Sequence, residues 1–444
     1  MNKILKFAPL ALALGALVGC APSQTGESEE IDGKVHVKFW HTMGQANQAM
    51  LDRMIATFEE ANPDIVIEEF SQGGYDDIAK KLGDAIPAGT TPTMSFCYPD
   101  NVASYIEAGA VEDMSSYVSN EEYGMDTSDY VSAYWNEGKS YGQQGLYSVP
   151  YAKSTEVMFY NATVFAEKGY QVPTTWDEMW TLCNQMKADF PSLKAPLGYD
   201  SDSNLFITMC EQNGIPYTTK EGGEGDHYIF DNAQAKAMVT ELKAKYDAKL
   251  LVTKGSLPNA TYTSTMFTNA EVLMSIGSTG GTTYNKSLNF DIGVAPIPAG
   301  KNNRHVISQG PSICFFSRCT KAQKVAAWKF YKHITNAENS ANFAIETGYE
   351  PVRNSSYQTP AFLNYMSQGQ KTGNAYIANC QGGNLLATAA NCTKECYENQ
   401  YFTSDVFDGS DAARDAVGGI LANVFLKDMS VDDAFSTAVT SCLF

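Results

Sequence analysis

Aromatic and polar side chains follow three predicted strands in the first hundred residues of the sequence. They are Trp40 and His41, then Tyr75 after a Gly-Gly turn, then Tyr98 and Asp100. Because ligands of open α/β sheets bind beyond the carboxyl ends of the strands, these side chains could meet in one site. The rings would pack on the C–H groups of a small molecule, and the polar groups would bind its hydroxyls. The alternative is that each ring only covers the edge of the core.

Signatures of catalysis are sparse. The run of residues 277–281 after a predicted strand lacks the Gly-Lys-Ser/Thr of a phosphate-binding P-loop. No spacing typical of a metal site or a catalytic triad is found among His36, His41, His227, His305 and His333. A glycosidase needs two converging carboxylates, so this enzyme class stays open as an alternative. Its candidate residues are Asp100, Asp405, Asp408 and Asp411. We expect no cofactor and no bound metal.

The cysteines show no zinc pattern. Ten are present, and setting Cys20 aside leaves an odd number, so at least one thiol is unpaired within a monomer. Cys392 and Cys396 lie four residues apart with Cys380 nearby, but that segment has no histidine. Buried thiols or a local disulfide fit this spacing better than a metal site.

The N-terminus has the features of a processing signal. Lys3 and Lys6 precede an apolar run, residues 7–18, that is too short to span a bilayer as a stable helix. Residues 17–20, Leu-Val-Gly-Cys, resemble a bacterial lipobox. We therefore expect a signal peptide over residues 1–19, lipidation of Cys20 and a polar tether over residues 20–33. An ordinary secretory signal is the alternative.

Length and charge limit the remaining possibilities. A chain of 444 residues is long for one core and suggests two or three domains. The net charge of −19 makes nucleic acid a poor partner, because binding to nucleic acid rests on neutralising phosphates. No later stretch is long and apolar enough to cross a membrane. We expect a protein of the bacterial cell envelope, on the periplasmic or extracellular face of a membrane.

Hydrophobic periodicity predicts strands alternating with helices, which is typical of an α/β fold with a parallel sheet. Strands are predicted at residues 35–39, 65–70, 94–98, 272–276, 292–298 and 313–316. Helices are predicted at residues 47–60, 76–88, 102–108, 162–169, 205–213, 232–249, 321–334, 341–347, 412–427 and 431–443. A further helix, capped by Thr174 or Thr175, should run to about residue 190.

Two proline-broken strands predict crossings between domains. Residues 145–161 contain two extended runs separated by Pro150, and residues 292–298 contain Pro296. Since proline lacks an amide donor, a central strand should not continue through it. A single break could be an edge hairpin, but two suit a chain that passes twice between interleaved lobes. We expect hinges at Pro150 and Pro296. The lobes would be residues 34–150 with 298–334, and residues 151–297 with 335–444.

Several short segments, in this order behind the lipobox, carry a family resemblance. They are residues 39–43 (FWHTM), 58–63 (FEEANP), 149–151 (VPY), 159–161 (FYN), 173–178 (PTTWDE), 293–298 (GVAPIP), 327–330 (AWKF) and 347–352 (TGYEPV). The chain thereby resembles the family 1 extracellular solute-binding proteins of bacterial ABC importers, especially the glycerol-3-phosphate and sugar branch. The resemblance implies a type II, two-lobe periplasmic-binding-protein fold. It also implies a monomer that closes on a ligand and presents it to permease subunits.

The resemblance also implies ligand-binding positions. They are Tyr75, Asp100, Ser154, Ser278, Gln309, Gly310 and Tyr349, to which we add the aromatic residues Trp40 and Tyr98. The glycerol-3-phosphate proteins carry a phosphate-gripping arginine near the C-terminus, where this sequence has Phe407 and Asp408. Arg353 and Arg414 are the arginines near enough in sequence to replace it.

A neutral sugar or polyol is the expected ligand. Carboxylates in place of a phosphate clamp repel a phosphomonoester, and no bidentate donor replaces the clamp. A cationic small molecule and a glycerol-phosphate derivative stay open on the same fold. A lipid-anchored glycoside hydrolase is the alternative from another class.

Overall fold

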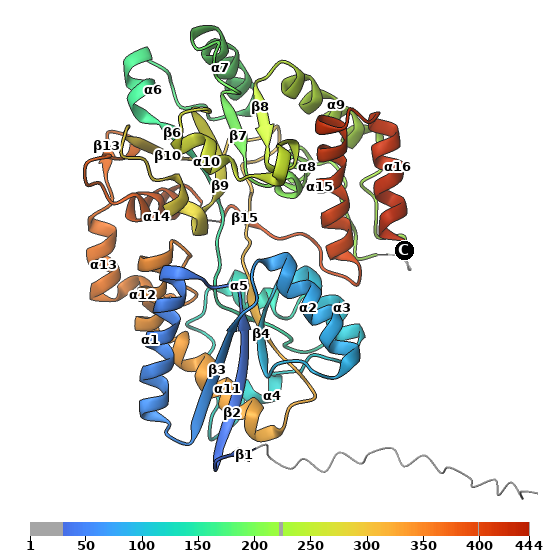
Figure 1. Cartoon of the computed structure of the whole chain (residues 1–444), viewed down its shortest axis with the longest axis vertical. Helices are drawn as coiled ribbons and strands as arrows, with labels where there is room; N and C mark the ends of the chain where they lie inside the picture. The colour runs from blue at the N-terminus through green and yellow to red at the C-terminus, as the bar shows by residue number, and fades with distance from the viewer. Residues whose placement is uncertain (1–29, 222–224, 398, 444) are drawn as a thin grey trace, which may run out of the picture.

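The computed structural model describes residues 30–221, 225–397 and 399–443. These residues form two lobes, each built on its own β-sheet (Figure 1). The predicted signal peptide, Cys20 and residues 21–29 of the tether lie outside the described residues. No helix within the described ranges combines the length and the apolar character needed to cross a bilayer.

The first sheet confirms the predicted parallel series at the start of the chain. Its strands are β1 (Glu30–Ile31), β2 (Lys34–His41), β3 (Ile65–Ser71), β4 (Met94–Cys97), β5 (Val149–Pro150) and β12 (Ser312–Phe315). The strand order is β1-β2-β4-β12-β5, with β3 also paired to β2. Strands β3 and β4 run parallel to β2, whereas β12 returns antiparallel between β4 and β5.

Helices cover this first sheet, as the predicted βαβ pattern requires (Figure 1). They are α1 (Gln45–Ala61), α2 (Tyr75–Ala88), α3 (Pro99–Glu107), α4 (Ser115–Val118), α5 (Ser132–Glu137) and α11 (Lys321–Ile334), and α12 (Ala337–Thr347) packs on α1. Helix α3 begins three residues before its predicted start, because Pro99 occupies its first turn, where proline is tolerated. Asp100 therefore lies in a helical turn and not in a loop.

The second sheet is mixed. Its order is β13-β14-β10-β6-β9-β7-β8. The strands are β6 (Glu156–Asn161), β7 (Leu197–Tyr199), β8 (Leu251–Thr253), β9 (Met274–Ser278), β10 (Ile292–Pro296), β13 (Lys371–Thr372) and β14 (Ala375–Ala378). Strand β6 pairs antiparallel with both β9 and β10, so the segment that follows Pro150 enters the middle of this sheet. A separate parallel pair is formed by β11 (Val306–Ile307) and β15 (Tyr401–Phe402).

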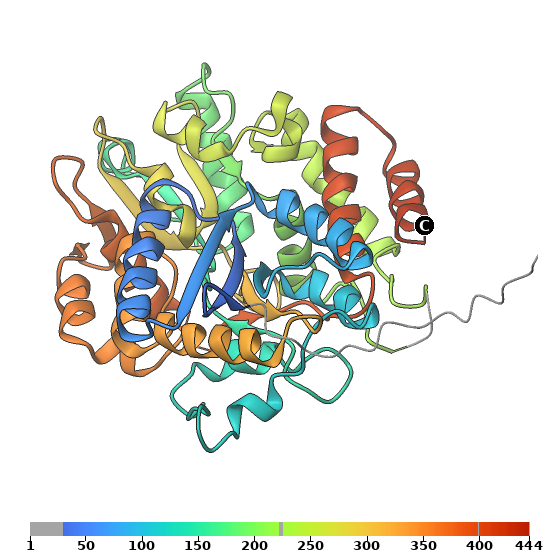
Figure 2. The same cartoon turned by 60° about the horizontal axis from the view of Figure 1, so that its bottom comes forward.

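The second lobe holds the remaining helices, which Figure 2 shows from a second direction. They are α6 (Ala162–Lys168), α7 (Trp176–Asp189), α8 (Asp202–Asn213), α9 (Ala233–Asp247), α10 (Thr263–Thr268), α13 (Pro360–Ser367), α14 (Leu385–Cys396), α15 (Ser410–Leu426) and α16 (Val431–Cys442). Short 3₁₀ turns are η1 (Lys254–Ser256), η2 (Pro258–Ala260), η3 (Thr279–Asn285) and η4 (Ser355–Gln358). Thr175 caps α7 in a reciprocal capping box with Glu178, which confirms the predicted start of that helix.

Each lobe has its own hydrophobic core. One core is built on the first sheet and the other on the second, and a small third cluster lies between α12, α13 and α14. Phe343 and Val352 pack in the core of the first lobe. The boundary predicted at residue 334 therefore comes before the chain leaves the first lobe.

Three segments connect the lobes and pair with one another. Residues 151–155 run from β5 to β6, and residues 297–311 return from β10 to β12. The third segment, residues 348–354, follows α12 and leads to η4. The first segment pairs with each of the other two. Ser154 and Gln309 exchange two backbone hydrogen bonds of 2.8 Å, and Glu350 N donates to Lys153 O at 2.7 Å. Gly310 has a φ of +99°, and a Cβ there would lie 2.0 Å from the carbonyl oxygen of Ala152, so only glycine fits this close approach. Pro150 and Pro296 are the last residues of β5 and β10, and their role as hinges stays a prediction.

A buried ion pair lies beneath these connections. Lys153 Nζ is 2.5 Å from Glu137 Oε1, and both side chains are almost fully buried. Lys153 Nζ also donates to the carbonyl oxygen of Gly310 at 3.2 Å, and Ser312 Oγ donates to Glu137 Oε1 at 3.1 Å. These bonds join α5, the first connection and the start of β12 at one point.

Removing one partner of this pair should be costly. Glu137→Gln leaves the Lys153 ammonium buried without a counter-charge, so we expect the free energy of unfolding to fall by about 3 kcal/mol. The matched control is Glu271→Gln, which breaks a partly exposed pair with Lys194 and should cost less than about 1 kcal/mol. Urea titration followed by circular dichroism measures both. Equal, small losses in the two variants would contradict the assignment.

Candidate functional site

A cavity of about 1840 Å³ lies between the two lobes. Its walls come from α2 and α3 on one side and from η1, α10, η3 and α15 on the other. We call this cavity the cleft. Most of the predicted ligand-binding residues line it: Tyr75, Tyr98, Asp100, Ser154, Ser278, Gln309 and Tyr349.

Three tyrosines form one wall of the cleft. Tyr75 opens α2, Tyr98 precedes α3, and Tyr349 follows Gly348, which ends α12 in a left-handed conformation. The rings of Tyr75 and Tyr98 meet edge to face with centroids 4.9 Å apart, and the hydroxyls of Tyr75 and Tyr349 share a hydrogen bond of 2.9 Å. Burial raises the pKa of all three hydroxyls, so they stay neutral and can donate.

A polar network joins the two lobes at the end of the cleft. Arg414 of α15 lies 3.9 Å from Asp100 of α3, and its guanidinium also donates to Asn204 Oδ1. Asn204 Nδ2 in turn donates to Gln309 Oε1 at 2.7 Å. Burial raises the pKa of Asp100 to about 6, although the nearby Arg414 opposes the rise. From the sequence, Arg414 was only one of two arginines that could replace the phosphate-gripping arginine. The structure places it in the cleft.

Glu156 also lines the cleft, although no pattern in the sequence predicted it. It begins β6, directly after the first connection, and its carboxylate accepts from Tyr199 Oη at 2.6 Å and from Asn204 Nδ2 at 2.7 Å. Burial raises the pKa of this carboxyl to about 7, because two neutral donors do not replace full hydration. The apolar run after residue 156 predicted the strand, but nothing in the sequence marked its first residue.

Two exposed aromatic rings face the cleft from the second lobe. Tyr262 is 56% exposed and Tyr284 is 73% exposed, and both line the cavity. Lys254 Nζ lies 4.2 Å from the centroid of the Tyr262 ring. Both tyrosines are in short loops and 3₁₀ turns, where hydrophobic periodicity gives no signal.

Acidic side chains outnumber basic ones around the cleft. The acidic lining residues are Asp76, Asp100, Glu156, Asp200, Asp202, Asp411 and Asp415, and the basic ones are Lys80, Lys254, Arg318 and Arg414. Asp200 and Asp202 are held by the structure itself, since Asp200 accepts from Thr263 N and Asp202 accepts from Gly255 N. They therefore have less capacity left for a ligand than Asp100.

Five predicted site residues do not line the cleft, and four of them lie as follows. Trp40 lies within β2, opposite Phe70 of β3, and packs against the first core, because the strand continues to His41. Gly310 faces a small neighbouring pocket beside Gln309. Phe407 stacks on His227 with ring centroids 4.6 Å apart, and Asp408 is exposed. The predicted phosphate-clamp region therefore lies beside the cleft.

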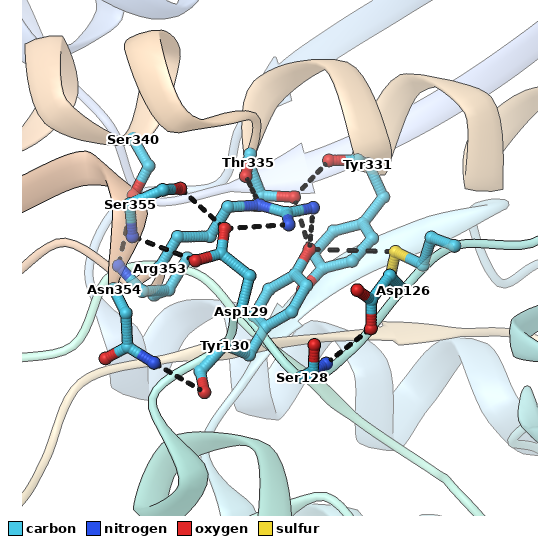
Figure 3. Close-up of polar contacts among 12 residues, drawn as sticks. Asp126, Ser128, Asp129, Tyr130, Tyr331, Thr335, Ser340, Arg353, Asn354 and Ser355 are labelled. Atoms are coloured by element: carbon cyan, nitrogen blue, oxygen red, sulfur yellow. Dashed lines mark hydrogen bonds and ion pairs between the residues drawn. The ribbon is translucent and has the colours of Figure 1, made fainter. Parts of the chain in front are cut away.

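Arg353, the fifth such residue, is committed to a different cluster (Figure 3). Its guanidinium lies over the Tyr130 ring at 4.2 Å, donates to the carbonyl oxygen of Thr335, and is 3.4 Å from Asp129. This cluster ties the segment after α12 to the start of α5. Arg353 thus cannot replace a phosphate clamp, whereas Arg414 is in position to do so.

The four carboxylates considered for a glycosidase are only partly brought together. Asp405 pairs with Lys220 and Asp408 is exposed, and neither lines the cleft. Asp100 and Asp411 both line it. Residues 138–142 match a Gly-x-Ser-x-Gly pattern, but Ser140 lies in a turn after α5 and donates to Asn136 O, outside the strand–turn–helix that a nucleophile elbow needs.

The described cysteines are free thiols, and no cluster of metal ligands is found among the described residues. Cys392 lies buried on α14, and Cys396 is partly buried one turn further along. A hydrogen bond from Cys392 lowers the pKa of the Cys396 thiol to about 6. Of the alternatives that the sequence left open, the buried thiols describe this pair best.

Comparison with known proteins identifies relatives that match most of the chain. A sequence profile described as bacterial extracellular solute-binding protein matches residues 53–367. The sn-glycerol-3-phosphate-binding periplasmic protein UgpB of Escherichia coli K12 is 26% identical over 377 residues, which cover 80% of this chain and 81% of that protein.

Two solved structures share the fold. UgpB from Mycobacterium tuberculosis in complex with glycerophosphocholine has a TM-score of 0.74 and 19% identity, covering 92% of this chain and 98% of that one. Maltose-bound MalE3 of T. maritima has a TM-score of 0.72 and 15% identity over the same shares. These likenesses confirm the predicted two-lobe fold.

The raised pKa of Glu156 predicts a pH dependence of stability. Between the carboxyl's ordinary pKa of 4.5 and its folded value of about 7, the folded protein binds more protons than the unfolded chain. Stability should therefore fall as the pH rises through this window. We expect wild type to lose stability relative to Glu156→Gln from pH 4.5 to 7 in urea titrations. Glu167→Gln, which removes an exposed carboxylate on α6, is the control. A constant difference between wild type and Glu156→Gln would refute the assignment.

Proposed function

Because the chain belongs to the bacterial extracellular solute-binding protein family, we propose that it captures a carbohydrate or polyol in the cleft and delivers it unchanged to an ABC importer. The family is one of binding proteins, so no catalytic step is assigned. Its members act outside the cytoplasm, which agrees with a place in the cell envelope. Attachment through a lipidated Cys20 and a monomeric state are parts of the same proposal.

The arrangement of ring faces and hydrogen-bonding groups in the cleft is the observation that carries this proposal. The exposed rings of Tyr262 and Tyr284 offer flat apolar faces, which suit the C–H surface of a sugar. Across the cleft, Tyr349, Asp100 and the free hydroxyl of Ser154 offer donors and acceptors for its hydroxyls. A cavity of about 1840 Å³ has room for more than one sugar ring.

Ligand capture would close the cleft by bending the connections. The hydrogen bonds between the three connecting segments are backbone bonds, so closure can change the angle between the lobes without breaking a side-chain contact among these segments. The contact between Asp100 and Arg414 already joins the lobes at one end of the cleft. Closure would bring the rings of the second lobe toward the tyrosines of the first.

A glycerol-phosphate derivative is the second candidate, and Arg414 is the observation that favours it. A guanidinium at a cleft wall can bind a phosphate oxygen with two parallel hydrogen bonds. The relative from E. coli is named for binding sn-glycerol-3-phosphate, and the structure from M. tuberculosis holds glycerophosphocholine. Asp100, 3.9 Å from Arg414, offsets part of its charge and favours a phosphodiester over a dianionic monoester.

A ligand panel distinguishes these candidates. A ligand at a hundredfold excess over its dissociation constant should stabilise the protein by about 2.7 kcal/mol, which raises the melting temperature. We expect sugars or polyols to do so in wild type and in Arg414→Lys alike. If glycerophosphodiesters bind instead, Arg414→Lys should weaken them at least tenfold, because lysine cannot form the bidentate contact. A panel of sugars, polyols and glycerophosphodiesters that leaves the melting temperature unchanged would overturn the proposal.

Ser154 offers a finer test of the same site. Its hydroxyl has no hydrogen-bond partner among the described residues, while its backbone holds the connection through Gln309. We expect Ser154→Ala to weaken ligand binding by about 1 kcal/mol and to leave the melting temperature of the free protein unchanged. Ser356→Ala, which removes a buried hydroxyl that does not line the cleft, is the matched control for calorimetry. Equal affinities in wild type and Ser154→Ala would remove this residue from the site.

A further inference from the structure

A second cavity, of about 400 Å³, lies next to the connections and apart from the cleft. Its walls come from α5 and α12, which pack in the first lobe, and from α13 and α14 toward the second. Tyr349 lines both this cavity and the cleft, so its side chain forms part of the wall between them. We call this second space the tyrosine chamber. Its volume is in the range of sites that hold small molecules.

Aromatic side chains dominate the tyrosine chamber. Its tyrosines are Tyr134, Tyr349, Tyr357, Tyr365, Tyr397 and Tyr401. Phe362 packs edge to face against Tyr357, with centroids 5.1 Å apart, and so keeps that ring in place. Neither Tyr357 nor Tyr365 forms a hydroxyl hydrogen bond with another described residue. The hydroxyls of these two residues are therefore available to an occupant.

Glu350 is the one acidic residue in the described lining of this chamber. Its carboxylate accepts from the hydroxyls of Tyr134 and Tyr401, the latter at 3.0 Å, and no cation pairs with it among the described residues. The neighbouring Arg353 is turned away toward Asp129 and Thr335 (Figure 3). Burial raises the pKa of Glu350, although the hydrogen bonds from the two tyrosine hydroxyls oppose the rise.

We propose that the tyrosine chamber binds a small organic cation, with its ammonium group beside Glu350 and its apolar part among the tyrosine rings. Cations are attracted to the faces of aromatic rings, and this attraction grows where water is excluded. A carboxylate that lacks a counter-charge is stabilised by the same ligand. Lys394, the one basic residue of the described lining, is exposed and leaves the interior free. This site is distinct from the cleft and would take a cation whichever ligand the cleft binds.

Calorimetry with simple ammonium ions tests the proposal. Benzylammonium and tetramethylammonium are the probes, and benzyl alcohol is the neutral control of similar shape. We expect both cations to bind wild type at least tenfold more tightly than benzyl alcohol does. Glu350→Gln keeps an oxygen acceptor for the two tyrosine hydroxyls but removes the charge, and should weaken benzylammonium at least tenfold.

A cleft variant locates the binding. Tyr262→Ala removes an exposed ring from the cleft and should leave benzylammonium affinity unchanged, because Tyr262 does not line the chamber. The proposal is overturned if neither cation binds, or if Glu350→Gln binds benzylammonium as wild type does. It is also overturned if Tyr262→Ala abolishes binding, which would place the probe in the cleft. If Glu350→Gln does not fold, the comparison of cation with alcohol on wild type still decides.

Discussion

The position of the Lys153 ammonium constrains the junction between the lobes. It is buried against Glu137, and it donates to the carbonyl oxygen of Gly310, while the Lys153 backbone accepts from Glu350. The charge of Lys153 therefore joins α5 to the first two connecting segments, and the backbone of the same residue joins the third. Because a buried ammonium has few alternative partners, the connections keep their register while the lobes on either side remain separate cores. The cleft and the tyrosine chamber both owe their shape to this fixed junction.

Much of the fold is predictable from local patterns. The alternation in β2 and the helical spacing of α1 and α2 mark the first sheet and its helices, and the two broken strands mark the crossings. Strands β7, β8 and β13 have only two or three residues each, too few to show a period. These strands form because other strands, most of them distant in sequence, pair with them through backbone hydrogen bonds. A local sequence pattern contains no information about such pairing.

Site residues could be predicted where they stand next to the end of a strand or helix. They could not be predicted where the packing of distant helices decides which way a side chain points. Tyr75 and Tyr98 follow strand ends, and Tyr349 follows a glycine that ends a helix. Residues that end a strand or a helix can be recognised in the sequence, so the positions of these tyrosines were predictable. Arg353 and Arg414 are equally plausible by distance along the chain. Only the packing of α15 against α8 and α3 aims Arg414 into the cleft, while a neighbouring aspartate and tyrosine hold Arg353 elsewhere.

The side chain of Tyr349 separates the cleft from the tyrosine chamber. Its hydroxyl is bonded to Tyr75 on the cleft side, and its ring stacks on Phe343 with centroids 5.6 Å apart. Since this side chain lines both cavities, a rotation of its ring would change the space on both sides. A ligand in the cleft and a ligand in the tyrosine chamber would therefore each bear on the same side chain.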